Sequence, residues 1–365
     1  MASNPLQRIS SKVQARERLS FDDGLRLFQS TDLLAIGAMA HQVRLRMHGH
    51  QAFYAVNLHI NPTNICTVRC KFCSFSRDAG AADAYALTPN QIEETVRAAI
   101  EQSQINEVHI VGGHNPALNF EYYEEMIRRI RALRGKEDLF IKAFSAPEID
   151  AMAKGSGLSW VAVLSRLRQA GLDGMPGGGA EIFDPEVRAR ICPEKISAGA
   201  WCAIHRIAHG FGLKTNATML YGHVETPEHR VAHLLKLREL QDQTKGFSAF
   251  VPLAYNPRNN ALSGMRETSG FLDLKIVSIS RLLLDNIPHI KAHGSATDLK
   301  FIQAALSFGA DDMGGTNLHE KVLHEAGSRS PEGLSSADLV RCITDAGFEP
   351  CLVNSAYVSH LKRTG

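Results

Sequence analysis

Residues 61–77 read Asn-Pro-Thr-Asn-Ile-Cys-Thr-Val-Arg-Cys-Lys-Phe-Cys-Ser-Phe-Ser-Arg, and the rest of the chain is best interpreted from this stretch. Cys66, Cys70 and Cys73 follow a C-x3-C-x2-C spacing that places three thiolates on one short loop. A structural zinc site needs four protein ligands, so zinc would require His59 or a distant residue as the fourth. A four-iron cluster usually takes four cysteines. Three cysteines would leave one iron open to bind a substrate. Three unconnected buried thiols are the remaining alternative.

The aromatic residues beside the cysteines narrow these alternatives. With Phe72 just before the third cysteine and Phe75 two places after it, the loop resembles the signature of the radical S-adenosylmethionine (SAM) superfamily. The resemblance implies that the open iron binds the amino and carboxylate groups of SAM. It also implies that an electron from the cluster releases a 5'-deoxyadenosyl radical, and that Phe72 and Phe75 belong to the cofactor site. The expected cofactors are a [4Fe-4S] cluster with three cysteine ligands and SAM as co-substrate.

The composition is that of a globular chain with no nucleic-acid or membrane signature. The chain has 365 residues, 44% of them hydrophobic, and a net charge of +2, so no basic footprint for nucleic acid is present. The N-terminus lacks the apolar run of a signal peptide, and no stretch approaches the roughly 20 apolar residues of a membrane span. The four cysteines outside the triplet lie singly, which is not a disulfide framework. We therefore expect a cytoplasmic protein.

From Tyr54 onward, strand-like and helical segments alternate. Strands are expected at residues 54–60, 106–111, 139–144, 172–182, 214–222, 247–255 and 289–294, with a weak eighth at 309–315. The first helix of this series has a clear start, because Thr88 is a good N-cap, Pro89 suits the first helical position and Gln91 completes a capping box. Eight strand–helix units over roughly 260 residues match a (β/α)8 barrel. We predict an α/β fold with a TIM-type (β/α)8 barrel at 54–317, an N-terminal helical extension at 1–53 and a C-terminal helical cap at 318–365.

Chemistry in such barrels takes place at the carboxyl ends of the strands, and the unusual residues of this chain collect there. In strand order they are the three cysteines, Gly112-Gly113-His114, Ser145 with Glu148, Glu181 after three glycines, His223, Tyr255-Asn256 with Arg258, His293, and Asp311 with Asp312. A consistent ring of polar groups is better evidence than any one of them. Each residue still has a structural alternative.

The candidates for the cofactor are Gly112, Gly113, Ser145 and Glu181. The paired glycines resemble those that receive the SAM amino group in this superfamily, although a plain turn also uses glycine. Glu181 and its glycines are candidates for holding the ribose or an arm of the substrate, or the glycines are turn residues only. Cys192 is interpreted as a small buried hydrophobic residue.

The candidates for the substrate and for proton transfer are less specific. His114 and His223 are acid–base candidates, or hydrogen-bonded structural histidines. Lys142 and Arg258 are candidate partners for an anionic substrate. Lys142 lies within a strand, so it needs a partner if its side chain points inward. The set of residues proposed to bind the substrate also includes Tyr255, Asn256 and His293.

Long segments of the chain resemble the aminodeoxyfutalosine synthase family of the futalosine route to menaquinone. They include NPTNICTVRCKFCSF, HIVGGHNP, MPGGGAEIFDPEVRARICPEK, LKTNATMLYGHVETPEHRVAHLLKLRELQD and FVPLAYNPRNN, and the similarity runs from about residue 15 to about residue 327. One departure is Gly-Gly-His-Asn-Pro, where the family more often has the histidine one place later, which leaves the role of His114 open.

The resemblance implies a transferase reaction on 3-[(1-carboxyvinyl)oxy]benzoate. The adenosyl radical would add to the vinyl carbon, the aryl group would migrate and the carboxylate carbon would be lost, giving 6-amino-6-deoxyfutalosine. An electron donor such as flavodoxin or ferredoxin would be needed, and a homodimer is left open. The alternatives are a radical enzyme like dehypoxanthine futalosine cyclase and, from another class, a zinc-binding structural protein.

Overall fold

The computed structural model describes residues 5–135, 138–262, 264–292, 299–327 and 333–358. Its centre is a parallel sheet whose seven strands follow one another in chain order. They are β2 (Asn57–Ile60), β3 (Glu107–Ile110), β4 (Phe140–Ala143), β5 (Gly174–Met175), β6 (Lys214–Tyr221), β7 (Phe247–Ala254) and β8 (His289–Ile290). An eighth strand, β9 (Asp312–Gly315), is bridged to the β8 edge through Lys291 and Asp312. Just after β9, Leu318 is bridged to Leu58 of β2, so the sheet returns on itself as the expected barrel.

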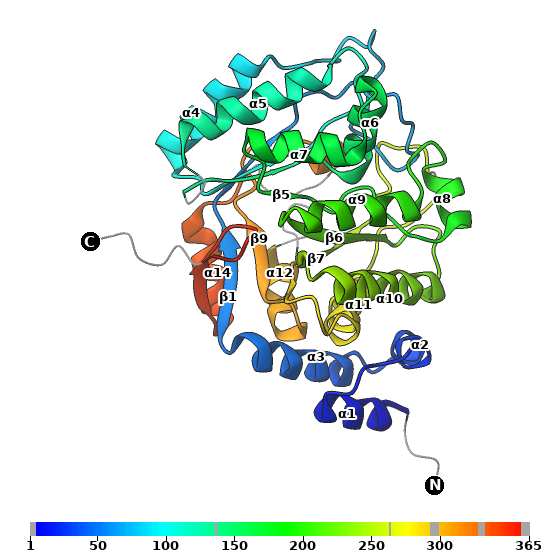
Figure 1. The fold of residues 1–365 in the computed structure, drawn as a ribbon. Helices are drawn as coiled ribbons and strands as arrows, with labels where there is room; N and C mark the ends of the chain where they lie inside the picture. Colours follow the sequence, from blue (N-terminus) through cyan, green and yellow to red (C-terminus); the bar gives the residue numbers. More distant parts are fainter. Residues whose placement is uncertain (1–4, 136–137, 263, 293–298, 328–332, 359–365) are drawn as a thin grey trace.

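Helices follow the strands and cover the outside of the sheet (Figure 1). They are α4 (Pro89–Ser103), α5 (Phe120–Leu133), α6 (Ala146–Ser156), α7 (Trp160–Ala170), α8 (Pro185–Ile191), α9 (Ala198–Gly210), α10 (Pro227–Thr244), α11 (Gly270–Leu283) and α12 (Leu299–Ala305), followed by a short 3-10 turn at Leu306–Phe308. The expected start of α4 is confirmed, because Thr88 and Gln91 form the reciprocal capping box.

The segments before and after the barrel flank it and are joined by strand pairing. Helices α1 (Pro5–Ala15), α2 (Phe21–Gln29) and α3 (Leu33–His48) come first, and α3 and α2 pack against α11 and α10 (Figure 1). Strand β1 (Gln51–Ala55) then pairs in parallel with β9 on one side and with β10 (Glu349–Leu352) on the other. Helices α13 (Val322–Glu325) and α14 (Ser336–Asp345) precede β10. The C-terminal segment expected to be helical therefore also contains a strand, because its backbone completes the edge of β1. The proposed domain limits stay a prediction.

Three expected strands have different limits. The first, at 54–60, is divided into β1 and β2 at Val56, whose amide donates to the side-chain oxygen of Asn106 at 3.1 Å and whose carbonyl accepts from the Asn106 amide at 2.9 Å. The fourth, at 172–182, is reduced to Gly174–Met175, because the glycines that follow leave the sheet and Gly179 has a φ of +91°. The seventh is reduced to His289–Ile290, followed by the single bridge between Lys291 and Asp312.

Polar side chains line the interior of the barrel on β2, β3 and β4. Asn57 and His59 alternate with core residues on β2, and the parallel register places His59 beside His109 and His109 beside Lys142. The rings of His59 and His109 stack with their centroids 4.6 Å apart. Side chains alternate between the two faces of a strand, so these polar groups point away from the helices.

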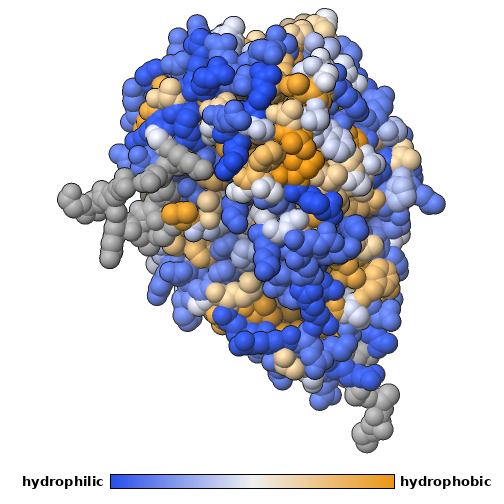
Figure 2. Space-filling model, viewed as in Figure 1, coloured by the Kyte–Doolittle hydropathy of each residue, from blue (hydrophilic) through white to orange (hydrophobic). Residues whose placement is uncertain are grey.

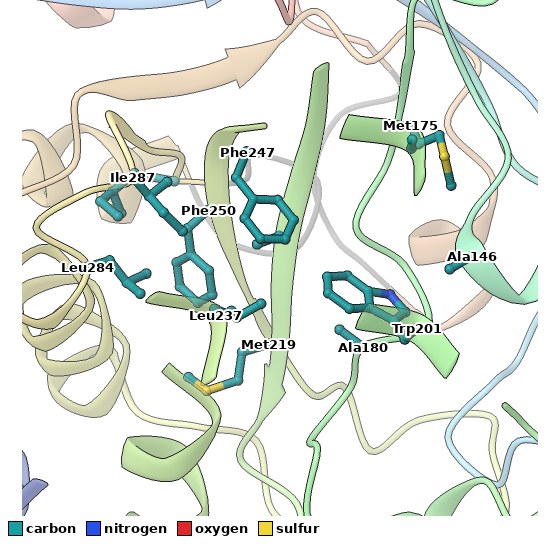
Figure 3. Packing of buried hydrophobic residues seen from close by; sticks show 14 of the residues in the cluster. Ala146, Met175, Ala180, Trp201, Met219, Leu237, Phe247, Phe250, Leu284 and Ile287 are labelled. Carbon is teal, nitrogen blue, oxygen red and sulfur yellow. The ribbon is translucent and has the colours of Figure 1, made fainter. Parts of the chain in front are cut away.

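The hydrophobic core lies between the sheet and the helices. Figure 3 shows Trp201 of α9 close to Ala180, and Phe250 of β7 close to Leu284 and Ile287. Trp201 also donates from its indole nitrogen to the carbonyl of Gly178 at 3.1 Å, so the core fixes the loop that follows β5.

The outer surface in this view is mostly hydrophilic, with small hydrophobic areas between the polar ones (Figure 2). Among the described residues, no helix has both the length and the apolar character required to cross a membrane.

Candidate active site

The cysteine loop connects β2 to α4, and its two arms are tied together at the base. Ile65 and Arg77 form a parallel bridge, and the Cys66 amide donates to the Arg77 carbonyl at 3.1 Å. Nearer the barrel, the Asn64 amide group donates to the Asp83 carbonyl at 2.9 Å and accepts from the Tyr85 amide at 2.8 Å. These bonds join the two ends of the segment between Cys66 and Ser76, so that it forms a loop with a fixed base.

The three thiols suit a metal centre. All are free and partly exposed, and the Cys73 amide donates to the Cys70 carbonyl at 3.0 Å, which turns the chain between these two ligands. Burial raises the pKa of the Cys70 thiol to about 12. A thiol bound to a metal ion is deprotonated outright, so a bound metal would offset this cost of burial.

Gly113 lets the loop after β3 lie directly against the cysteine loop. A Cβ atom at Gly113 would be 2.1 Å from the Ile65 carbonyl oxygen and 3.0 Å from the Cβ of Cys66. The Gly113 amide donates to the Thr63 carbonyl at 2.9 Å, and the His114 carbonyl accepts from the Thr67 amide at 3.1 Å. Glycine is required here because backbone meets backbone on both sides of Cys66.

Glu148, at the start of α6, ties the loop after β3 to the end of β4. Its carboxylate accepts from the Gly112 amide at 3.0 Å, the Ser145 amide at 2.7 Å and the Ser145 hydroxyl at 2.6 Å. Ser145 thus holds Glu148 in place. Burial raises the pKa of Glu148 to about 7, against the effect of these donors.

Glu181 is paired with Lys195, a residue that the sequence did not single out. The Lys195 ammonium lies 2.7 Å from Glu181 Oε1, and both side chains are largely buried. Burial by itself would raise the pKa of Glu181, but Lys195 reverses the effect and the pKa is lowered. Glu181 has a φ of +46°. The Arg188 guanidinium donates to the Gly179 carbonyl at 3.2 Å, which holds the glycine-rich loop that presents Glu181.

The two candidate histidines have different environments. His114 lines a cavity of about 410 Å³ beside the cysteine loop, together with Thr67, Glu148 and Lys195. Burial lowers the pKa of His114 to about 4, so the ring is neutral at pH 7. His223 uses both ring nitrogens locally: Nε2 lies 3.0 Å from the Leu220 carbonyl, and Nδ1 accepts from the Val224 amide at 2.7 Å. This arrangement is that of a structural histidine.

The loop after β7 touches the cysteine loop. The Ala261 amide donates to the Lys71 carbonyl at 2.8 Å, and the Ser74 hydroxyl donates to the Arg258 carbonyl at 3.1 Å. The Tyr255 hydroxyl donates to Asn260 Oδ1 at 2.6 Å, and Asn260 in turn donates to the Asn256 carbonyl at 2.8 Å.

Arg258 pairs with Glu267 and donates to the Gly327 carbonyl at 3.2 Å. His293 lies outside the described residues. The backbone of this loop therefore lies against the cysteine loop, whereas the Tyr255 hydroxyl and the Arg258 guanidinium bond to residues outside the cysteine loop.

Lys142 lies elsewhere. Its ammonium is 2.6 Å from Glu107 Oε1 and 2.8 Å from the Ser355 hydroxyl, with side-chain exposures of only 4% for Lys142 and 2% for Glu107. The expected inward partner exists, but it is a carboxylate of the protein rather than one of the loop groups. The Lys142 ammonium therefore lies at the amino-terminal end of the strands, opposite the cysteine loop. Ser355 of the C-terminal segment lies there too.

Sequence reasoning also overlooked the histidine pair of the barrel interior. His59 was considered only as a zinc ligand, and His109 not at all. The signal was present, since polar residues at alternate positions in short apolar strands indicate a polar interior.

These loops and this barrel are those of a radical SAM enzyme. Residues 60–237 match the Radical SAM superfamily, and residues 244–363 match the CofH/MqnC C-terminal region. The solved structure of methylornithine synthase is similar in fold, with a TM-score of 0.75, 19% identity and coverage of 95% of this chain and 98% of that one. The FeFe-hydrogenase maturase HydG from Carboxydothermus hydrogenoformans gives a TM-score of 0.76 at 17% identity, covering 96% of this chain and 80% of that one.

Sequence relatives define the family more narrowly. The aminodeoxyfutalosine synthase of Thermus thermophilus is 41% identical, with coverage of 96% of this chain and 94% of the relative. The aminodeoxyfutalosine synthase of Streptomyces coelicolor is 42% identical, with coverage of 96% of this chain and 93% of the relative. A 5-amino-6-(D-ribitylamino)uracil–L-tyrosine 4-hydroxyphenyl transferase of Methanopyrus kandleri is 39% identical over 87% of each chain. The chain belongs to the aminodeoxyfutalosine synthase family within the radical SAM superfamily.

Proposed function

We propose that this chain joins the adenosyl group of SAM to 3-[(1-carboxyvinyl)oxy]benzoate, with aryl migration and loss of the carboxylate carbon, to form 6-amino-6-deoxyfutalosine. The observation that carries the proposal is the match to two aminodeoxyfutalosine synthases over 96% of the chain at 41–42% identity. The hydroxyphenyl transferases are the nearest competing activity among the relatives described above, at 39% identity.

Cys66, Cys70 and Cys73 are the proposed ligands of a [4Fe-4S] cluster with one iron left for SAM. When bound, the cluster and SAM supply the 5'-deoxyadenosyl radical. A single zinc ion would hold its sulfur ligands about 3.8 Å apart, from tetrahedral bonds of about 2.3 Å. Among the described residues, the one group of three potential ligands with atoms within 4.8 Å of one another is His48, His289 and Asp311, not the cysteines. The cluster is favoured because the three cysteines lie within residues 60–237, which match the Radical SAM superfamily.

The His48 group is itself a poor cation site. Asp311 is fully buried and forms an ion pair with Arg281, and the other carboxylate oxygen is 2.5 Å from His289 Nδ1. A metal ion would have to displace the guanidinium, so this group is best described as a buried hydrogen-bond network.

The residues around the proposed cluster orient the reactants and exclude water. Gly112 and Gly113 are held in place by Glu148 and the cysteine loop, and their backbone groups are proposed to meet the amino group of SAM. Glu181, fixed by Lys195, is proposed to hold the ribose. Rigid placement of both reactants supplies much of the rate in such a reaction, and a closed mouth keeps the radical from side reactions.

Arg258 is the proposed partner of a substrate carboxylate, with Tyr255 and Asn256 beside it. Its ion pair with Glu267 is exposed on both sides, at 35% and 55%, and such pairs contribute at most about 1 kcal/mol. A substrate carboxylate can therefore replace Glu267. Lys142 is not retained for the substrate, because its buried pair with Glu107 is already satisfied.

The test is an anaerobic assay of the reconstituted full chain with dithionite, SAM and the enolpyruvyl benzoate, followed by mass spectrometry. We expect an adduct that contains adenosine and the aryl group and has lost one carbon, and no product from Cys70→Ala. Parallel reactions with dehypoxanthine futalosine, and with 5-amino-6-(D-ribitylamino)uracil plus tyrosine, test the competing activities. Turnover of either in place of the benzoate would overturn the assignment. A one-electron donor of the flavodoxin or ferredoxin type is the proposed physiological reductant.

A further inference from the structure

The segment from Ile191 to Lys195 contacts the cysteine loop at three points around Cys70. The Arg69 amide donates to Glu194 Oε2 at 2.7 Å, and the Lys71 amide donates to the Ile191 carbonyl at 2.8 Å. Just beyond them, the Lys195 ammonium lies 5.3 Å from the centre of the Phe72 ring. The residues on both sides of one candidate metal ligand are thus bound to the same short segment.

This segment is itself firmly anchored. Arg188 of α8 is buried and donates to the Ile196 carbonyl at 2.5 Å and to the Ala180 carbonyl at 2.7 Å. Lys195 adds its ion pair to Glu181, and Cys192, only 1% exposed, is packed in the core as expected. The contacts on the cysteine loop are therefore made from a rigid support rather than from a flexible loop.

The charge of Lys195 is also well placed. Its side chain is 14% exposed, so its field is screened less than that of a surface lysine. A cation near a cluster stabilises the reduced form, which carries one more negative charge. Groups that surround a metal site set its redox properties in this way.

We propose that Ile191–Lys195 is a clamp that holds the cysteine loop in the geometry for cluster binding, and that Lys195 is a positioning residue that raises the reduction potential of the bound cluster. The proposal rests on the proposed function, because it takes the three cysteines as cluster ligands. It assigns roles to Glu194 and Lys195, which are neither ligands nor substrate contacts.

The first experiment needs no cluster. Hydrogen–deuterium exchange of the apo full chain would compare Glu194→Ala with Glu186→Ala, which changes an exposed glutamate of α8, the helix just before this segment. We expect the Arg69 amide to exchange about tenfold faster in Glu194→Ala and to be unchanged in the control, and Glu194→Gln, which keeps an acceptor, to restore most of the protection. Equal exchange in Glu194→Ala and wild type would overturn the clamp.

The second experiment is a potentiometric titration of the reconstituted protein, followed by electron paramagnetic resonance. At a fixed potential, Lys195→Met should reduce the ratio of reduced to oxidised cluster about tenfold, which is 59 mV for a one-electron couple. Lys195→Arg should stay within about twofold of wild type, as should Lys236→Met, which removes a distant exposed lysine. An unchanged potential in Lys195→Met would refute the second role.

Removal of Lys195 also leaves Glu181 without its cation, so a double variant is needed. If the Lys195 ammonium acts directly on the cluster, the reduction potential of Glu181→Gln/Lys195→Met should stay as low as that of Lys195→Met. A return to the wild-type value would show that the unpaired carboxylate caused the change, which would overturn the role of Lys195. If wild type itself formed no cluster, or Cys70→Ala kept one, the proposed function would fail, while the exchange result on the apo chain would still decide the clamp.

Discussion

The buried pair of Lys142 and Glu107 allows a quantitative test of where the substrate does not bind. Removing one partner of a buried ion pair costs about 3–5 kcal/mol, because the other charge is left without compensation. In Lys142→Met, Glu107 still accepts from the Ser355 amide at 2.7 Å, which points to the lower end, about 3 kcal/mol. For a chain of this length, an unfolding entropy of about 2.1 cal/mol/K per residue converts that loss into a fall in Tm of about 4 °C.

The effect should depend on pH in a defined direction. Burial would raise the pKa of Glu107, but Lys142 reverses this and lowers it in the folded chain. In wild type the pair therefore contributes stability above the unfolded pKa of about 4.3, and this contribution is lost as the pH falls. In Lys142→Met the isolated carboxylate is disfavoured, so the variant should lose more stability at pH 8 than at pH 4.

Urea unfolding at the two pH values provides the measurement. Glu107→Gln/Lys142→Met, which has neither charge, should recover most of the loss, because replacing both partners of a buried pair is often nearly neutral. The KM for the enolpyruvyl benzoate should be unchanged in the single variant under conditions where it is folded. If Lys142→Met unfolded like wild type and instead raised this KM tenfold, Lys142 would bind the substrate and the buried-pair interpretation would be wrong.

Three other changes test the mouth of the barrel. Gly113→Ala should lower the iron bound per chain after reconstitution while costing about 1–3 kcal/mol of stability, because its Cβ would meet the Ile65 carbonyl; full iron content would contradict the packing argument. Glu148 has a pKa raised to about 7, so its contribution to wild-type stability is lost as the pH rises from about 4.3 through 7, and urea unfolding of Glu148→Gln should lack that decline. Arg258→Met should raise the KM for the benzoate substrate about tenfold or more, since a hydrogen bond to a charged group contributes about 1.5–3 kcal/mol, with little change in Tm; an unaltered KM would remove Arg258 from the substrate site.

Local signals in the sequence were sufficient for much of the fold. The Thr88 cap and the proline after it determine where α4 begins, and the alternation of strands and helices predicts the barrel. The limits of β5 were wrong, because 172–182 is apolar and rich in glycine, and only tertiary context decides where its pairing stops. Strand β10 was missed for a related reason: Glu349–Leu352 becomes a strand by pairing with β1, almost 300 residues earlier in the chain.

In the candidate site, too, local sequence patterns reveal some residues and only the folded structure reveals others. The glycines at 112–113 and the cysteines are recognisable because their spacing is local. For His223 the sequence left an acid–base role and a structural role open, and only the structure shows that its ring nitrogens bond to the backbone of Leu220 and Val224. Lys195 was not singled out, because Pro-Glu-Lys carries no local signal of a functional site. It becomes buried only because the glycine-rich loop after β5 brings Glu181 against it.

Charge pairing inside the barrel limits where a dianionic substrate can be held. At the amino-terminal end of the strands, Lys142 pairs with Glu107, and Lys291 lies 3.1 Å from Asp312. Each of these buried cations has its own carboxylate, so an entering dianion would gain little there and would lose its hydration. Arg258, whose partner is exposed, lies at the opposite end beside the cysteine loop. The substrate is therefore expected to stay near the proposed cluster, which is why Lys142→Met should change stability and Arg258→Met should change KM.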